Sequence, residues 1–156
     1  MKIIEGVVAT PYARIAIALA RNHFINHALL DGALDILKRI GQVADDNILV
    51  VHVPSVDKLP LTACCLSKQG DFDAIIALGS VIRSEIEQYH EVITQCRQGL
   101  AHLELHTELP VLCGILVLET LEQVTTQTGI KTRHNKGSEA ALTALEMINV
   151  LQTIKN

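Results

Sequence analysis

A group of polar side chains follows directly after the apolar runs of this chain, at positions where a strand is expected to end. They are Arg21, His23, Asp57, Lys58, Arg83, Glu85, Glu87 and Gln88. Imidazole and carboxylate groups can exchange protons, and Lys and Arg can hold anionic groups. Ligands of open parallel sheets bind beyond the carboxyl ends of the strands, so these positions form a candidate ligand site. Ordinary solvation of loops explains the same composition equally well.

The elements that would position this site alternate along the chain. Apolar runs predict strands over 14–20, 47–53, 72–78 and 111–118, with 47–53 as a buried strand and Gly79 starting the loop after the third strand. Apolar residues at helical spacing predict helices over 25–41, 61–70, 87–106, 120–128 and 138–154. This alternation implies an α/β fold, with a parallel four-stranded sheet between two helical layers (αβα).

Length and charge limit the class of protein. The chain has 156 residues, 49% of them hydrophobic, which suffices for one packed domain and is few for two, so we expect a single domain over 1–156. The net charge of −4 leaves no basic surface for a nucleic acid. With aromatic residues at only 3%, a base-stacking surface is not expected either.

The chain start and the cysteines bear on the compartment. A charge at Glu5 interrupts the first residues, and no apolar run approaches about eighteen residues, so we expect neither a secretory leader nor a membrane span. Cys64, Cys65, Cys96 and Cys113 lack the paired spacings of zinc sites. We expect reduced, packed thiols, no metal and a cytoplasmic protein.

The last predicted helix is apolar on more than one face. Its apolar residues run from Ala140 to Ile154 and cover more of the helix surface than one packed layer needs. A helix of this kind requires a second partner, and homo-oligomerisation supplies one. A deeply buried helix is the alternative.

Several segments carry a resemblance to a known family. ATPYARIAIALAR, INHALLDGALDILKRIG, LPLTACCLSKQGDFDAIIALGSVIR, GLAH and HNKGSEAALTALEMINVLQTIKN resemble 6,7-dimethyl-8-ribityllumazine synthase, from the first residues to the last. The resemblance implies a flavodoxin-like sheet and assembly through pentamers, often into an icosahedral shell. It also implies the penultimate step of riboflavin synthesis, in which 5-amino-6-ribitylamino-pyrimidinedione condenses with 3,4-dihydroxybutanone 4-phosphate. That step needs no metal or cofactor.

The chain departs from the family pattern after its first two strands. The family has Arg-Phe-Asn, whose aromatic ring stacks on the pyrimidine, where this chain has Arg21, Asn22 and His23. His23 and Phe24 are the candidate replacements, and the lost stacking is worth roughly 0.5–1.5 kcal/mol. The family's Pro-Gly turn and ribityl-binding glutamate correspond here to the run Pro54, Ser55, Val56, Asp57 and Lys58. Lys58 only donates hydrogen bonds where the family's carboxylate accepts them.

The departure after the third strand concerns proton transfer. The family has Arg-Gly-x-Thr-x-His, in which the central residues receive the phosphate and the histidine moves protons; this chain has Arg83, Ser84, Glu85, Ile86, Glu87 and Gln88. Two carboxylates therefore occupy the phosphate position. The amide of Gln88 cannot exchange a proton near neutral pH, so a factor of roughly 10²–10⁴ in rate is expected to be lost. His90 is a poor replacement, because two helical residues differ by about 200° of rotation.

Other positions are altered or retained. Cys113 replaces a phenylalanine of the family, and Gln127 replaces the arginine that clamps the ketone phosphate, a contact worth about 1.5–3 kcal/mol. The backbone-contact segment of Ser80, Val81 and Ile82 is retained, together with Lys131, Asn135, Lys136 and Glu139. Lys136 and Glu139 can equally serve the start of the last helix or a subunit contact. The loop over 131–136 is about one residue longer than the usual family form, and the resemblance implies that such lengthening can stop assembly at the pentamer. It also adds Arg133 and His134, which form either a new anion pocket or a solvated basic loop.

These departures predict a substrate pocket that has been dismantled on a retained fold, with very weak or absent synthase activity. Three classes of function remain open. The chain could be a non-catalytic subunit or scaffold, with a functional synthase paralogue as its partner. It could bind or convert another heterocycle or polyol with Lys58, Glu85, Gln88 and Arg133. It could also be an atypical but active synthase, since orienting two reactants is itself a large effect.

Overall fold

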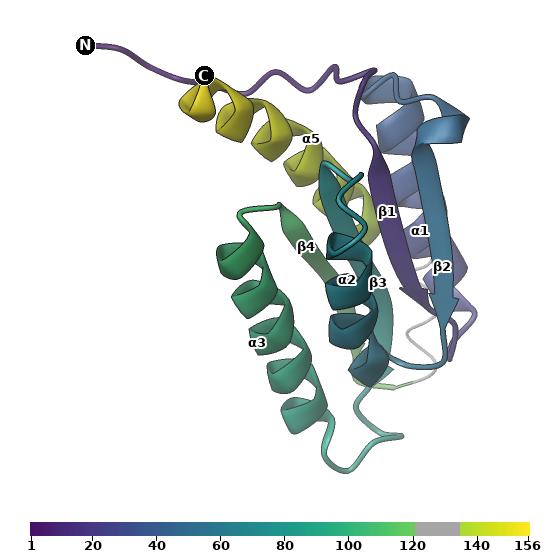
Figure 1. Ribbon diagram of the computed structural model, residues 1–156. Helices are drawn as coiled ribbons and strands as arrows, with labels where there is room; N and C mark the ends of the chain where they lie inside the picture. Colours follow the sequence, from purple (N-terminus) through teal and green to yellow (C-terminus); the bar gives the residue numbers. More distant parts are fainter. Residues whose placement is uncertain (121–134) are drawn as a thin grey trace.

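The central sheet has four parallel strands in the order β2-β1-β3-β4 (Figure 1). A computed structural model of the chain describes residues 1–120 and 135–156. The strands are β1 (Ile15–Ala20), β2 (Ile48–Val53), β3 (Ala74–Ile82) and β4 (Val111–Leu118). The predicted helix over 120–128 and the loop that follows it lie almost entirely outside the described residues.

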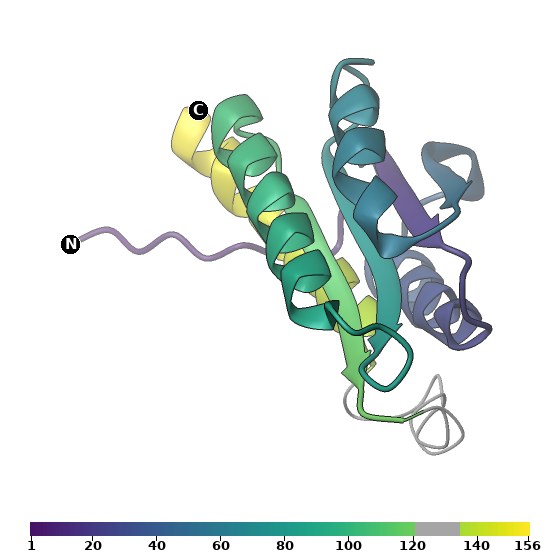
Figure 2. The same cartoon turned by 90° about the horizontal axis from the view of Figure 1, so that it is seen from below.

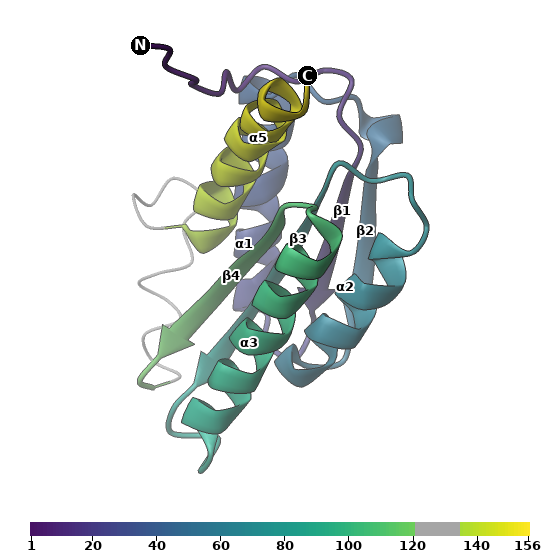
Figure 3. The same cartoon turned by 60° about the vertical axis from the view of Figure 1, so that its left-hand side comes forward.

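Helices cover both faces of the sheet, as the sequence predicts (Figure 3). One face packs against α1 (Ile25–Asp35), which continues as a π-helix over Ile36–Ile40, and against α5 (Lys136–Lys155). The other packs against α2 (Leu59–Ser67) and α3 (Tyr89–Thr107). Short 3-10 turns, η2 (Asp45–Asn47) and η3 (Val56–Lys58), flank β2. The three-layer α/β architecture is confirmed.

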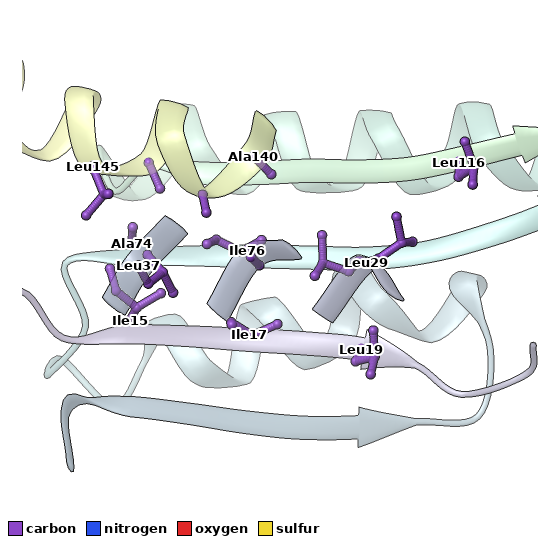
Figure 4. Packing of buried hydrophobic residues seen from close by; sticks show 14 of the residues in the cluster. Ile15, Ile17, Leu19, Leu29, Leu37, Ala74, Ile76, Leu116, Ala140 and Leu145 are labelled. Atoms are coloured by element: carbon purple, nitrogen blue, oxygen red, sulfur yellow. The ribbon is translucent and has the colours of Figure 1, made fainter. Parts of the chain in front are cut away.

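Strand β1 divides its side chains between the two layers. Ile15, Ile17 and Leu19 face α1 and α5 (Figure 4), whereas the alternate residues are alanines that face α2 and α3. Successive side chains of a strand point to opposite faces, and a central parallel strand is buried on both. This explains why the run is apolar throughout.

Two strand predictions were wrong in detail. The segment over 47–53 is an edge strand, and Leu49 is 43% exposed, because β2 has a neighbour on one side only. Strand β3 does not stop at Gly79 but continues to Ile82. A Cβ atom at Gly79 would lie 2.8 Å from Cγ2 of Val56 and 3.1 Å from Cβ of Ala20. The glycine therefore permits close packing inside the strand and does not make a turn.

Asn135 joins the start of α5 to α1. Its side-chain oxygen accepts hydrogen bonds from the backbone N–H groups of Gly137 (2.9 Å) and Ser138 (3.1 Å). Its amide donates to the backbone carbonyl of Ala28 (3.0 Å). This cap explains why the helix begins at Lys136, two residues before the predicted start.

The first residues form an arm that belongs to no helix or strand (Figures 1 and 2). The arm packs on α5 at Gly6, where a Cβ atom would lie 2.3 Å from the carbonyl oxygen of Glu146. The side chains of Met1, Ile3 and Val7 are exposed. Among the described helices, none combines the length and the apolar composition needed to cross a membrane.

Candidate active site

The loops that follow β1, β2 and β3 lie together at the end of the sheet where the strands have their carboxyl ends, because all four strands are parallel (Figure 1). At this end of the sheet β1 stops before β3: the pairing of the two strands ends at Leu19 and Leu78, while β3 stays paired with β4 as far as Ile82. The last residues of β3 therefore have no strand partner on the β1 side. The loop after β1 can therefore reach over the end of β3.

His23 lies over the end of β3 and is the centre of a polar cluster. Its Nε2 is 3.0 Å from Oε2 of Glu85, and its Nδ1 is 3.2 Å from Oγ of Ser80 and 3.1 Å from Nδ2 of Asn22. The side chain of His23 is 14% exposed, and Ser80 is fully buried. The sequence indicated all four residues as site residues, but it did not indicate that an imidazole joins them.

Asn26 supports this cluster and was not among the predicted site residues. Its amide donates to the backbone carbonyl of Ala20 and, at 3.3 Å, to Oδ1 of Asn22. Asn26 is 1% exposed, and its own Oδ1 has no hydrogen-bond partner among the described residues. The available signal was a polar residue on the buried side of the first turn of α1.

Ser80, Val81 and Ile82 are strand residues and not loop residues, contrary to the prediction. All three are almost completely buried, and they pair with Leu116, Val117 and Leu118 of β4. The loop after β3 therefore begins at Arg83. The start of this loop is held in place because the backbone N–H of Arg83 donates to the carbonyl of Leu118 at 2.7 Å.

The loop after β2 carries two exposed charges and one core residue. Val56, the first residue of η3, is 2% exposed and packs in the core. The hydroxyl of Ser55 donates to Asp57, and this hydrogen bond lowers the pKa of the carboxyl group, helped by the charge of Lys58. Asp57 and Lys58 themselves form an ion pair of 3.6 Å. The sequence placed Val56 at the site with its two neighbours, whereas the structure buries it.

The loop after β3 leaves the predicted catalytic position in solvent. Gln88 is exposed and precedes the first residue of α3, without a capping hydrogen bond from its side chain. Ile86 is half-buried against the α2 and α3 layer. The Arg83 guanidinium pairs with Glu119 at 3.2 Å and lies 5.1 Å from the ring centre of Tyr89. His90 was judged a poor replacement because two residues of one helix differ by about 200° of rotation. Gln88 lies before the first residue of α3, so this argument does not hold for the pair.

Cys113 and Lys136 form a second group, in a pocket of about 200 Å³ between β4 and the start of α5. Lys136 makes an ion pair of 3.4 Å with Glu139. A hydrogen bond from the thiol of Cys96, together with the charge of Arg97, lowers the pKa of Cys113 to about 7. The same bond and burial raise the pKa of Cys96. All four cysteines are free thiols, but Cys65 and Cys113 are exposed, so they are not packed as expected.

The structure thus brings part of the predicted site together. Asn22, His23, Ser80 and Glu85 are in contact, while no hydrogen bond or ion pair joins Cys113 and Lys136 to them in the described part of the chain. Gln127, Lys131, Arg133 and His134 lie outside the described residues. Within residues 1–120 and 135–156, no group of three His, Cys, Asp or Glu side chains is placed to hold a metal ion.

Comparison with known proteins gives a consistent result. Residues 12–152 match the family model of 6,7-dimethyl-8-ribityllumazine synthase. Proteins of that name from Edwardsiella ictaluri (strain 93-146) and Yersinia pestis (strain Pestoides F) are 56% and 54% identical to this chain. Each alignment covers 99% of both chains. The chain therefore belongs to the 6,7-dimethyl-8-ribityllumazine synthase family.

Proposed function

We propose that this chain is an active 6,7-dimethyl-8-ribityllumazine synthase, a transferase that condenses 5-amino-6-ribitylamino-pyrimidinedione with 3,4-dihydroxybutanone 4-phosphate. The observation that carries the proposal is 54–56% identity, over nearly the whole chain, with proteins that bear this name. This similarity favours the atypical but active synthase over the expectation of a dismantled pocket.

The geometry at the strand ends supports the same proposal. The last residues of β3 lack a strand partner along the edge that faces β1, and an imidazole lies over this edge, held by Ser80 and Glu85. Orientation of two reactants at such an edge accounts for a large part of the rate of a condensation. No metal or cofactor enters the proposed reaction.

The test is a steady-state assay of the purified protein with both natural substrates, in which formation of the lumazine is followed. Control reactions omit the protein or one of the substrates, because the two compounds can condense slowly on their own. We expect product formation well above the rate without protein. A rate equal to that of the protein-free control would refute the proposal.

A second candidate function is a non-catalytic subunit or a binder of another heterocycle. The observation that favours it is the solvent-exposed Gln88 and the two carboxylates, Glu85 and Glu87, at the expected phosphate position. A thermal-shift screen with flavins, pterins and purines would reveal a ligand, since a compound at 100 times its Kd adds about 2.7 kcal/mol. Native mass spectrometry of this protein mixed with the synthase of a relative would reveal mixed oligomers, as expected of a non-catalytic subunit that assembles with a functional synthase.

Assembly into pentamers, alone or stacked, is part of the proposal, and so is a cytoplasmic location. Exposed apolar surfaces among the described residues include the N-terminal arm and a groove of about 690 Å³ between α3 and α5. The apolar side chains lining the groove are Leu105, Leu109, Leu112, Met147, Leu151 and Ile154. An apolar patch of this kind marks a protein interface.

Light scattering after gel filtration tests the assembly. We expect a mass of five times the 17.0 kDa chain mass, or a multiple of that value. Leu105→Glu should lower the mass, because Leu105 lines the groove and is 80% exposed. Leu61→Glu is the matched control, since Leu61 is 66% exposed on α2 and does not line the groove. Unchanged assembly of the Leu105→Glu variant would contradict the use of this surface.

A further inference from the structure

We propose that His23 is the proton-transferring residue of this site, with Glu85 as its positioning residue. The inference rests on the proposed synthase function. It assigns to the loop after β1 a role that the family pattern places at position 88. The geometry that points to it is the set of contacts that His23 makes across the end of β3.

The hydrogen bonds define which nitrogen carries the proton. A carboxylate only accepts hydrogen bonds, so Nε2 of His23, at 3.0 Å from Glu85, is the protonated nitrogen of the neutral ring. Nδ1 is then the acceptor, and it accepts hydrogen bonds from the hydroxyl of Ser80 and from the amide of Asn22. This is the arrangement of a general base oriented by a carboxylate.

Nδ1 has one lone pair and two donors compete for it. Ser80 is fully buried, whereas Asn22 is exposed. A substrate that enters over the end of β3 can displace the exposed amide and take its place at Nδ1. Glu85 would keep the ring in position through Nε2. The hydroxyl of Ser80 can rotate, so that it frees the lone pair of Nδ1 and accepts a hydrogen bond once Nδ1 is protonated.

The chemistry of the two substrates requires such a group. Loss of phosphate from the ketone needs a C–H bond on the neighbouring carbon to break. The electron pair of that bond forms a carbon–carbon double bond, and the phosphate leaves with the electrons of its own C–O bond. Nδ1 of His23 takes the proton, and the imidazolium formed is stabilised by Glu85. The imidazolium returns its proton to the terminal carbon of the enol so formed, which becomes a methyl group, while the enol O–H proton passes to the departing phosphate and a second carbonyl group forms. The two amines form their C–N bonds at the two carbonyl carbons, and each carbonyl oxygen leaves as water with hydrogens from the amines and from the N–H of the pyrimidine ring.

The two carboxylates near the phosphate position are then no longer equivalent. Both carboxylates are exposed to solvent, Glu85 by 42%, but the charge of Glu85 also faces His23. Proton transfer by a positioned side chain contributes roughly 10²–10⁴ to the rate. This is the factor that an amide at Gln88 cannot supply.

The test compares His23→Ala with wild type, with and without free imidazole at a fixed pH. We expect kcat to fall by roughly 10²–10⁴ with a much smaller change in KM. Added imidazole should restore part of the rate in proportion to its concentration, because it can occupy the vacated position. A residue with a merely structural role would not be replaced in this way. His90→Ala, at an exposed position in the first turn of α3, is the matched control and should behave as wild type.

Glu85→Gln is a second variant that stays informative if His23→Ala does not fold. Its amide oxygen can still accept from Nε2, but it removes the charge that stabilises the imidazolium, so we expect kcat to fall by about tenfold. If the wild type is active and the rate of His23→Ala lies within threefold of the wild-type rate, the inference is wrong while the proposed function stands. The same holds if His23→Ala loses rate and imidazole does not restore it. An unchanged Glu85→Gln rate would overturn the role of Glu85. An inactive wild type would instead overturn the proposed function, and this inference with it.

Discussion

Asn135→Ala should destabilise the protein by about 2 kcal/mol, and the magnitude follows from the contacts of this side chain. The loss of an N-cap costs typically about 1 kcal/mol, and here two backbone N–H groups lose their acceptor. The loss of the hydrogen bond to the carbonyl of Ala28 costs about 1 kcal/mol more, because Asn135 is 4% exposed and water does not easily replace it.

Thermal unfolding measures this prediction. For a domain of this size, about 2 kcal/mol corresponds to a Tm lower by roughly 4–8 °C. Wild type and variant must be compared at the same protomer concentration, because oligomerisation shifts the apparent stability. The decrease in Tm should be accompanied by weaker packing of α5 on α1, the two elements that Asn135 connects.

Asn135→Asp is the matched control for this experiment. Its carboxylate still caps α5 and suits the positive end of the helix dipole, but it cannot donate to Ala28. We therefore expect about half the effect of Asn135→Ala. A change in Tm of less than about 1 °C for Asn135→Ala would refute the reasoning, as would equal effects of the two variants.

The remaining predictions concern packing and the cysteine pair. Gly137→Ala should abolish the folded protein or destabilise it by about 3 kcal/mol or more, because the new Cβ atom would lie 1.8 Å from the carbonyl oxygen of Leu29. A titration of thiolate absorbance should show one thiol with a pKa of about 7, and Cys113→Ser should remove it. Because the thiolate of Cys113 is favoured in the folded state, the free energy of unfolding should rise between about pH 7 and pH 9.

Each of these predictions has its control. Ser138→Ala, next to Gly137, should leave the Tm within about 1 °C of wild type, and a well-folded Gly137→Ala variant would contradict the close approach of α1 and α5. Cys96→Ala should move the titration of Cys113 back towards 9.0, since the hydrogen bond from Cys96 is the main cause of the low pKa. If the thiol near pH 7 persists in Cys113→Ser, its assignment is wrong.

The sequence was sufficient to predict the architecture, since the alternation of apolar runs and helical patterns indicates directly which residues are buried. The strand over Val111–Leu118 was predicted at its observed bounds, because Pro110 and an acidic residue flank a continuous apolar run. The end of β3 was misplaced because glycine is read as a turn signal, whereas Gly79 is required by its neighbours Val56 and Ala20. Such neighbours are distant in sequence and cannot be inferred from local composition.

The candidate site was predictable as a set of residue types and not as a network. Strand ends indicated His23 and Glu85, and the family resemblance indicated Ser80, but the contacts among them depend on the order of β1 and β3 in the sheet. The comparison of position 88 with the family pattern led to the expectation of lost proton transfer. That comparison, made position by position, could not reveal an imidazole that arrives from another strand end.

The most direct test of the account is the kcat of the Gln88→His variant relative to wild type. If His23 already transfers the proton, a second imidazole at position 88 adds little, and we expect the ratio to stay within about fivefold. If the wild-type site lacks a proton-transferring group, the restored histidine should raise kcat by roughly 10²–10⁴. A ratio in that range would contradict the role proposed for His23.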